Sequence, residues 1–140
     1  MIPGKRLVRP DEEPFAAFNW GKIKFLCEPQ LTNAEHLTVV HVWLEPDQGH
    51  LRHNHPGSEE ILFVIAGTGE QMVETDLEEK GGKPETFNVK PGDLVHIPAS
   101  VFHQTLNTGK DTMQILAVYS PCGPEKVLRE LPDYRLLTTK

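Results

Sequence analysis

The chain has 140 residues, of which 20 are acidic and 14 are basic, so its formal net charge at pH 7 is -6. This length suffices for one domain with a core that needs no disulfide bonds, and we expect a single domain over residues 1–140. The acidic balance argues against a nucleic-acid partner, because the densest basic group is only Lys5, Arg6 and Arg9.

The N-terminal stretch MIPGKRLVRPDEEPF lacks the apolar run of a secretory signal. No apolar segment of the sequence approaches the length that spans a bilayer. The two cysteines, Cys27 and Cys122, lack the CxxC spacing of a zinc or redox site. We therefore expect a cytoplasmic protein with two free thiols and no membrane partner.

Short runs rich in aliphatic, aromatic and β-branched residues recur along the chain, and turn residues separate them. Closely spaced strands of this kind are typical of an antiparallel sandwich or barrel. Only the segment GPEKVLREL has a helical pattern, with Pro124 in its first turn. The sequence predicts an all-β domain with one short C-terminal helix. Strands are expected within 15–28 and at 36–46, 60–67, 69–76, 85–90, 93–98, 101–107 and 113–120, the core at about 36–120 and the helix at about 123–131.

The stretch HLRHNHPGSEE at 50–60 holds three of the seven histidines of the chain. Residues two apart in a strand point to the same face, so His53 and His55 are expected to direct their imidazoles together. Glu60 opens the next strand after a tight PGSE connection, which can return its carboxylate to the level of the histidines. His103 lies on a later strand that follows a Pro-Gly turn and a second proline.

Two motifs around these residues resemble those of the cupin family. Residues 53–67 fit the first motif, which reads HxH, four residues, Glu, six residues, Gly. Residues 92–107 fit the second, which ends with His and, four positions later, Asn. The resemblance implies a double-stranded β-helix, a jelly-roll-like antiparallel barrel. It also implies that four side chains bind a metal ion: His53, His55, Glu60 and His103. Glu59 is the competitor to Glu60, but strand parity places it on the opposite face.

The chain departs from the family pattern at two turn positions. Asp47 stands where the first motif opens with Gly, and Ser100 stands where the second motif has Gly. Gly67, at the end of the first motif, is expected in a turn that needs a positive φ. Asn107 is expected to shape a turn and not to bind metal. These departures affect loop conformation and leave the four implied ligands unchanged.

Three imidazoles and one carboxylate suit Fe(II), Mn(II), Co(II), Ni(II), Cu(II) or Zn(II) equally well. Four protein ligands on an octahedral ion leave two positions for water or substrate. We therefore expect one divalent transition metal ion per chain and a small-molecule substrate inside the barrel. Iron would give a dioxygenase, whereas manganese, nickel or zinc would give Lewis-acid isomerase, cyclase, lyase or decarboxylase chemistry. The alternative function is a non-catalytic module that binds a sugar or an organic acid.

His41 and His96 lie in otherwise apolar strands. Each could line the cavity, as an acid/base group or as a partner that holds the second nitrogen of a ligand. The alternative is a hydrogen-bonded core or interface histidine. His36 and His50 are expected to be exposed, and His50, three positions before His53, is expected to face away from the HxH pair.

Large apolar residues outside the motifs carry two further expectations. Trp43, Phe63, Phe102 and Met72 are expected to fill the barrel. The family resemblance implies a homodimer, and the segment FAAFNWGKIKFL offers an apolar surface that could pair with a second chain.

Overall fold

The computed structural model describes residues 1–137, which form two antiparallel sheets and a few short helices. Among these residues, no helix has both the length and the apolar character that crossing a membrane requires. The elements in chain order are η1 (Pro10–Glu12), β1 (Ala16–Phe18), β2 (Gly21–Cys27), α1 (Pro29–Thr32), β3 (Thr38–Leu44), β4 (Gly49–His53), β5 (Glu59–Ala66), β6 (Gly69–Glu74), η2 (Glu78–Lys80), β7 (Pro84–Val89), β8 (Leu94–Ile97), β9 (His103–Asn107), β10 (Met113–Ser120), α2 (Pro124–Arg129) and β11 (Arg135–Leu136).

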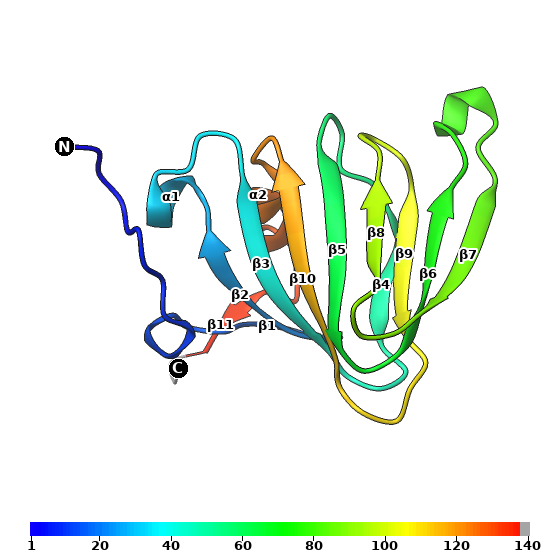
Figure 1. Cartoon of the computed structure of the whole chain (residues 1–140), viewed down its shortest axis with the longest axis horizontal. Coiled ribbons are helices and arrows are strands. Elements are labelled where there is room, and N and C mark those ends of the chain that lie inside the picture. The colour runs from blue at the N-terminus through cyan, green and yellow to red at the C-terminus, as the bar shows by residue number, and fades with distance from the viewer. Residues whose placement is uncertain (138–140) are drawn as a thin grey trace.

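The larger sheet has seven strands in the order β11-β1-β2-β3-β10-β5-β8, and the smaller has four in the order β4-β9-β6-β7. In Figure 1 the larger sheet runs from β2 through β3, β10 and β5 to β8, the smaller sheet is made of β4, β9, β6 and β7, and α2 lies behind β3 and β10. The predicted all-β, jelly-roll-like architecture is confirmed. The C-terminal helix is present but shorter than predicted, and α1 is a single turn that the sequence pattern did not predict.

The inner face of the larger sheet supplies most of the core. Side chains along β3 and β10 alternate strictly between buried and half-buried, as the period of two in a strand requires. Val40 and Ala117 are fully buried on the inner face. The same alternation places Trp43 and Phe63 on the outer face, where Phe63 is 39% exposed. The prediction that these two residues fill the barrel is therefore wrong, and Phe102 and Met72 also lie outside the buried core.

The N-terminal strands are part of the chain's own core. Ala16, Phe18 and Ile23 are each at most 2% exposed. The outer edge of β1 is covered by β11, which pairs with it in antiparallel fashion. The segment FAAFNWGKIKFL is thus largely used within the chain, so it is not the free surface that the sequence suggested for a partner.

Two carboxylates hold α2 against the larger sheet. Arg129 donates two hydrogen bonds to Glu28, at 2.6 and 2.7 Å, and its guanidinium lies 3.9 Å from the centre of the Phe25 ring. Glu125 is 1% exposed and accepts a hydrogen bond from the Thr38 hydroxyl at 3.0 Å. These contacts fix the helix although it is only six residues long.

Both positions where the chain lacks a family glycine have the backbone conformation that favours glycine. Asp47 has a φ of 64° and Ser100 a φ of 68°. Gly67 has a φ of 79°, as predicted, and a Cβ there would lie 2.8 Å from the Cα of Met113. The turns therefore keep their shape with non-glycine residues, at a cost in backbone strain.

Candidate metal centre

The smaller sheet brings two histidines face to face. His53, at the end of β4, lies directly opposite His103, at the start of β9. His55 lies two residues beyond the end of β4, in the turn before β5, so it is not on the same strand as His53 as the sequence suggested. Its ring nevertheless lies 5.0 Å from that of His53, and one ring nitrogen from each of the three histidines falls within 4.8 Å of the others.

Glu60 enters this cluster from the larger sheet. Its carboxylate oxygen Oε1 lies 3.2 Å from Nε2 of His55 and 3.1 Å from Nε2 of His103. Glu60 is 4% exposed, whereas the side chain of Glu59 is 61% exposed on the other face. Strand parity therefore selects Glu60, as predicted.

For two histidines, a backbone carbonyl two residues earlier in the chain determines which ring nitrogen carries the proton. Nδ1 of His53 lies 2.7 Å from the Leu51 carbonyl oxygen, and Nδ1 of His103 lies 3.0 Å from the Val101 carbonyl oxygen. A carbonyl oxygen only accepts, so each Nδ1 carries the proton and, in the neutral ring, each Nε2 presents a lone pair. Nε2 of His103 therefore faces the Glu60 carboxylate oxygen lone pair to lone pair.

Three atoms of this cluster are buried without a hydrogen-bond partner among the described residues: Nε2 of His55, Oε1 of Glu60 and Nε2 of His103. Buried polar atoms are normally satisfied, so such a group needs an explanation. A cation bound by all three atoms would remove the repulsion and satisfy each lone pair. The donor set therefore fits a divalent transition metal ion.

The protonation states of the cluster also suit a cation. Burial opposes ionisation of Glu60, but hydrogen bonds and positive charge from His103 and His55, when these rings are protonated, lower its pKa to about 2, and a cation bound in the cluster would act in the same direction. Burial, with His103 and His50 nearby, lowers the pKa of His53 to about 3. At neutral pH the carboxylate is thus ionised and the His53 imidazole neutral, which are the forms that bind metal.

His50 is a fourth histidine near the cluster, and the prediction that it is exposed is wrong. A β-bulge on β4 places two residues, Leu51 and Arg52, opposite one residue of β9. The extra residue reverses the parity, so His50 and His53 face the same interior and their rings lie 5.4 Å apart. Nε2 of His50 is buried without a hydrogen-bond partner among the described residues, and burial lowers its pKa to about 4.

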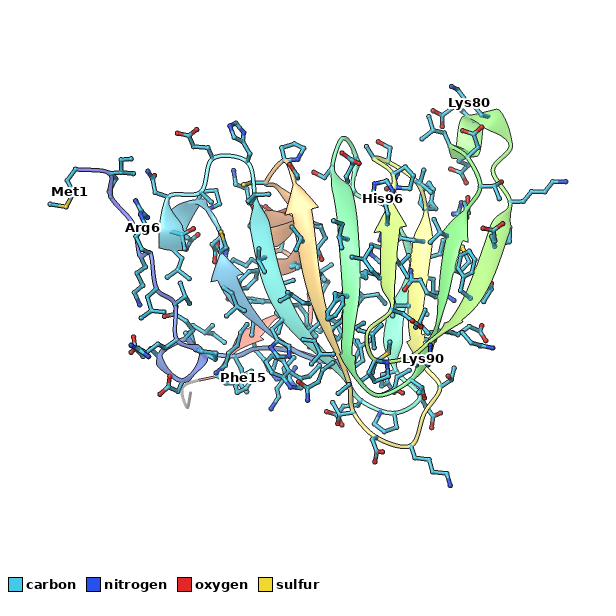
Figure 2. The ribbon with its side chains drawn as sticks, in the orientation of Figure 1. Met1, Arg6, Phe15, Lys80, Lys90 and His96 are labelled. Atoms are coloured by element: carbon cyan, nitrogen blue, oxygen red, sulfur yellow. The ribbon has the colours of Figure 1, made fainter. Side chains whose placement is uncertain are left out.

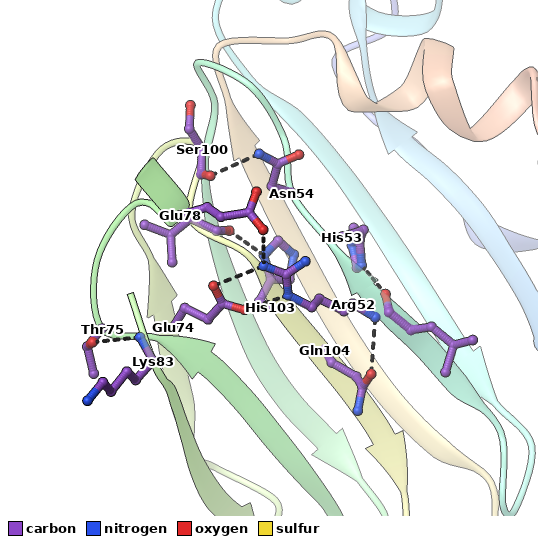
Figure 3. A network of polar contacts seen from close by, with 12 residues as sticks. Arg52, His53, Asn54, Glu74, Thr75, Glu78, Lys83, Ser100, His103 and Gln104 are labelled. Atoms are coloured by element: carbon purple, nitrogen blue, oxygen red, sulfur yellow. Dashed lines mark hydrogen bonds and ion pairs between the residues drawn. The ribbon is translucent and has the colours of Figure 1, made fainter. Parts of the chain in front are cut away.

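Arg52 fixes the bulge from the outer side of the smaller sheet (Figure 3). Its backbone N–H donates to the Gln104 side chain at 3.1 Å, and its guanidinium donates to Glu74 at 2.6 and 3.2 Å and to Glu78 at 3.0 Å. The guanidinium also lies 3.9 Å from the centre of the Phe102 ring. The bulge is therefore anchored on the opposite face from the histidines.

The structure brings neither His41 nor His96 to the cluster. His41 lies on the outer face of β3, stacked on Trp43, and its Nε2 lies 3.0 Å from the Gln114 side-chain oxygen. His96 lies on the outer face of β8, paired with Glu59 at 2.8 Å (Figure 2). Neither residue lines the cavity, and neither is a core histidine, because each is hydrogen-bonded on the outer face of the larger sheet. His36 is exposed, as predicted.

A cavity of about 770 Å³ opens beside the histidines. Tyr119 forms part of its inner end, and its ring lies 5.0 Å from that of His55. Burial, reinforced by the Glu60 carboxylate, raises the pKa of Tyr119 well above its usual value. Trp20 and α2, which sequence reasoning did not assign to the site, supply other parts of the wall. In the sequence, only the apolar character that Trp20 and the α2 segment share could have suggested that they line the cavity.

Residues 40–119 match the family model described as "Cupin domain". The chain belongs to the cupin family. This cupin is 31% identical to "Auxin-binding protein 1" of Arabidopsis thaliana over 84 residues, which are 58% of this chain and 42% of that protein. It spans less than half the length of the first curated relatives that it matches.

Solved structures share the fold of this cupin at lower sequence identity. KdgF from Halomonas sp. is 18% identical with a TM-score of 0.70, and the match covers 86% of this chain and 98% of that one. An oxalate decarboxylase from Lactobacillus farciminis is 23% identical with a TM-score of 0.74, and the match covers 94% of this chain and 39% of that one. All four residues that the family resemblance implied as ligands lie within the part that matches the family model.

Proposed function

We propose that this cupin is a divalent-metal-dependent enzyme that acts on a small organic molecule in the cavity. One observation carries the proposal: Nε2 of His55 and Nε2 of His103 converge on Oε1 of Glu60 at 3.2 and 3.1 Å, and all three atoms are buried without a hydrogen-bond partner among the described residues. This arrangement is unfavourable without a cation. His53, His55, Glu60 and His103 would hold one ion per chain.

When bound, the ion supplies a Lewis acid with open positions for substrate or for oxygen. Residues of the chain orient the ligands and supply the negative charge of the site. The Leu51 and Val101 carbonyls fix the rings of His53 and His103 through their Nδ1 protons, which keeps both Nε2 atoms aimed at one point. The Glu60 carboxylate, ionised at neutral pH, contributes the negative charge of the set.

The choice between oxygen chemistry and Lewis-acid chemistry depends on a general base. His41 and His96, the candidates for that role, face away from the cavity. Among the described residues that line the cavity, His50 is the one histidine outside the proposed ligands. We propose His50 as the base if the enzyme uses Lewis-acid chemistry, because it lies beside His53.

A non-catalytic small-molecule binder is the second candidate. The scarcity of acid/base groups in the cavity favours it, since binding needs no proton transfer. The name of one relative, "Auxin-binding protein 1", describes binding and not catalysis, whereas the oxalate decarboxylase with the same fold is named as an enzyme.

Elemental analysis of the purified and reconstituted protein tests the metal site. Wild type should hold about one divalent ion per chain, as expected for a four-ligand site. His55→Ala and His103→Ala should each lower the occupancy, because each removes one donor. His96→Ala is the matched control and should bind metal like wild type. A wild type that stays metal-free, or a control as damaged as His103→Ala, contradicts the assignment.

Activity with each reconstituted form then separates enzyme from binder. Turnover of any substrate by the metal-loaded wild type, lost in His103→Ala, supports an enzyme. Tight ligand binding without turnover under every metal supports the binder.

We also propose that the protein is a homodimer, as the family resemblance implies, and that it is cytoplasmic. Light scattering at micromolar concentration tests the dimer, and a monomer mass contradicts it. Cell fractionation tests the location.

A further inference from the structure

The wall of the cavity beyond the histidines is mainly apolar. Trp20, from the turn between β1 and β2, stacks on Phe18 at 4.7 Å and meets the His50 ring edge-on at 4.1 Å. The opposite parts of the wall come from β4, from β9 and from the region of α2. The apolar lining residues are Trp20, Leu51, Leu106, Val127, Leu128 and Leu131. A wall of this kind binds an apolar or aromatic body by burying its surface.

Several polar groups in the wall are already engaged within the protein. Asn54 donates to the Ser100 carbonyl at 3.0 Å, and the Ser58 hydroxyl donates to the Pro121 carbonyl at 2.9 Å. Cys122 donates to the Leu37 carbonyl at 3.1 Å. By contrast, the His50 ring has a buried Nε2 atom with no partner among the described residues. The buried polar atom that remains free for a ligand therefore lies at the histidine end of the cavity, while Asn19, Asp47 and Gln48 are exposed in the lining.

The charges of the wall are the decisive feature. Among the described residues that line the cavity there is no lysine or arginine. Asp47, which lies at the exposed side of the lining, adds a negative charge. An anionic group placed against this wall would lose its hydration without a cationic partner, which is costly. The metal ion of the proposed function would be the one strong positive charge facing the cavity.

We propose that the cavity accepts molecules with a single oxygen-donor head for the ligand cluster and an apolar, preferably aromatic, body, and that it rejects molecules carrying a second anionic group. This proposal rests on the proposed function, because the metal holds the head. It excludes dicarboxylates and sugar phosphates as substrates of this chain.

Three hydroxamates with the same chelating head test the proposal on zinc-loaded protein by titration calorimetry. Acetohydroxamate has no apolar body, benzohydroxamate has one, and 4-carboxybenzohydroxamate adds a second anion to it. Benzohydroxamate should bind about tenfold tighter than acetohydroxamate, because the ring buries apolar surface. The added carboxylate should weaken binding about tenfold, because it finds no cation in the wall. Equal affinity for acetohydroxamate and benzohydroxamate, or no loss from the carboxylate, overturns the proposal.

A charge substitution in the wall sharpens the test. Val127 lines the cavity and is 57% exposed, so Val127→Arg should fold and should recover the affinity for 4-carboxybenzohydroxamate. Phe87→Arg is the matched control, since Phe87 is 42% exposed on β7 outside the lining. Recovery by the control as large as that by Val127→Arg contradicts a local effect of the wall.

Metal content, measured on the same samples, separates the two proposals. Protein that takes up no zinc refutes the proposed function and this inference together. Protein that holds zinc but binds the three hydroxamates in another order refutes this inference alone.

Discussion

The two ends of the cavity differ in how the chain encodes them. The ligand cluster comes from His53, His55, Glu60 and His103, all within the residues that match the family model. Much of the apolar wall comes from outside that match, from Trp20 and from the segment that contains α2. Chemistry and selectivity are therefore carried by different parts of the sequence. The wall can change while the cluster stays intact, and each end can be tested separately.

The largest expected effect is at the cluster. Glu60→Gln should weaken metal binding but raise the stability of the metal-free protein. Loss of the carboxylate should weaken metal binding by at least about 100-fold, the upper range for losing a group that only orients a ligand. The amide can donate to the bare Nε2 atom of His103, so the metal-free variant should be more stable than wild type by about 1–3 kcal/mol. Metal titration and denaturant unfolding of chelator-treated protein measure the two effects. A metal-free variant less stable than wild type would show that the lone pairs do not repel one another.

The next effect is at the wall, where Arg129→Gln should loosen α2 and leave the cluster unchanged. The substitution removes the cationic partner of the buried Glu28 carboxylate. Because Arg129 is partly exposed, we expect a loss of about 2 kcal/mol of unfolding free energy, less than for a fully buried pair. Metal content should equal that of wild type, while benzohydroxamate should bind more weakly. Lys126→Gln, an exposed change on the same helix, is the control and should alter neither property. Loss of metal in Arg129→Gln would show that the two ends are not independent.

A smaller effect links acid to the metal-free protein through His50. Burial lowers its pKa from 6.5 to about 4. The unfolded chain therefore binds the proton more readily than the folded chain between these values, and stability falls as pH drops from about 7 toward 4. We expect His50 to account for a loss of somewhat under about 2 kcal/mol between pH 7 and pH 5. Thermal unfolding of chelator-treated wild type and of His50→Gln measures it, and an equal pH dependence in the two proteins would contradict this origin.

The smallest effect concerns the turns at which the chain departs from the family pattern. Asp47→Gly should relieve left-handed strain and raise the free energy of unfolding by about 0.5 kcal/mol, since the greater freedom of glycine in the unfolded chain offsets part of the gain. Ser100→Gly should be nearly neutral, because it also removes the hydrogen bond from the Gly57 N–H to the Ser100 hydroxyl. Denaturant unfolding measures both variants, and a loss of stability in Asp47→Gly would mean that the aspartate has a role of its own.

The sequence predicted most strands, though not β4 or β11, and it predicted that the four residues would cluster, because alternation and motif spacing are local properties. The prediction for His50 was wrong because a β-bulge adds one residue to β4. The extra residue reverses which side chains face the interior, and no residue type in the sequence marks the bulge. The sequence left His41 and His96 open because an apolar strand does not show which of its faces is inside. The wall could not be predicted, since Trp20 and α2 reach the cavity only through the folded chain.

The hydrogen bonds at Nδ1 of His53 and His103 have a consequence for how the protein can change over time. Each histidine donates to the backbone carbonyl two positions earlier in its own segment. A backbone carbonyl is present whatever side chain a position carries. Substitutions at Leu51 or Val101 therefore leave the acceptor in place, so the orientation of the two rings does not depend on which side chains these positions carry. The orientation of the ligands is inherited from the main chain, and the cluster can survive mutations that would disable a site oriented by side chains.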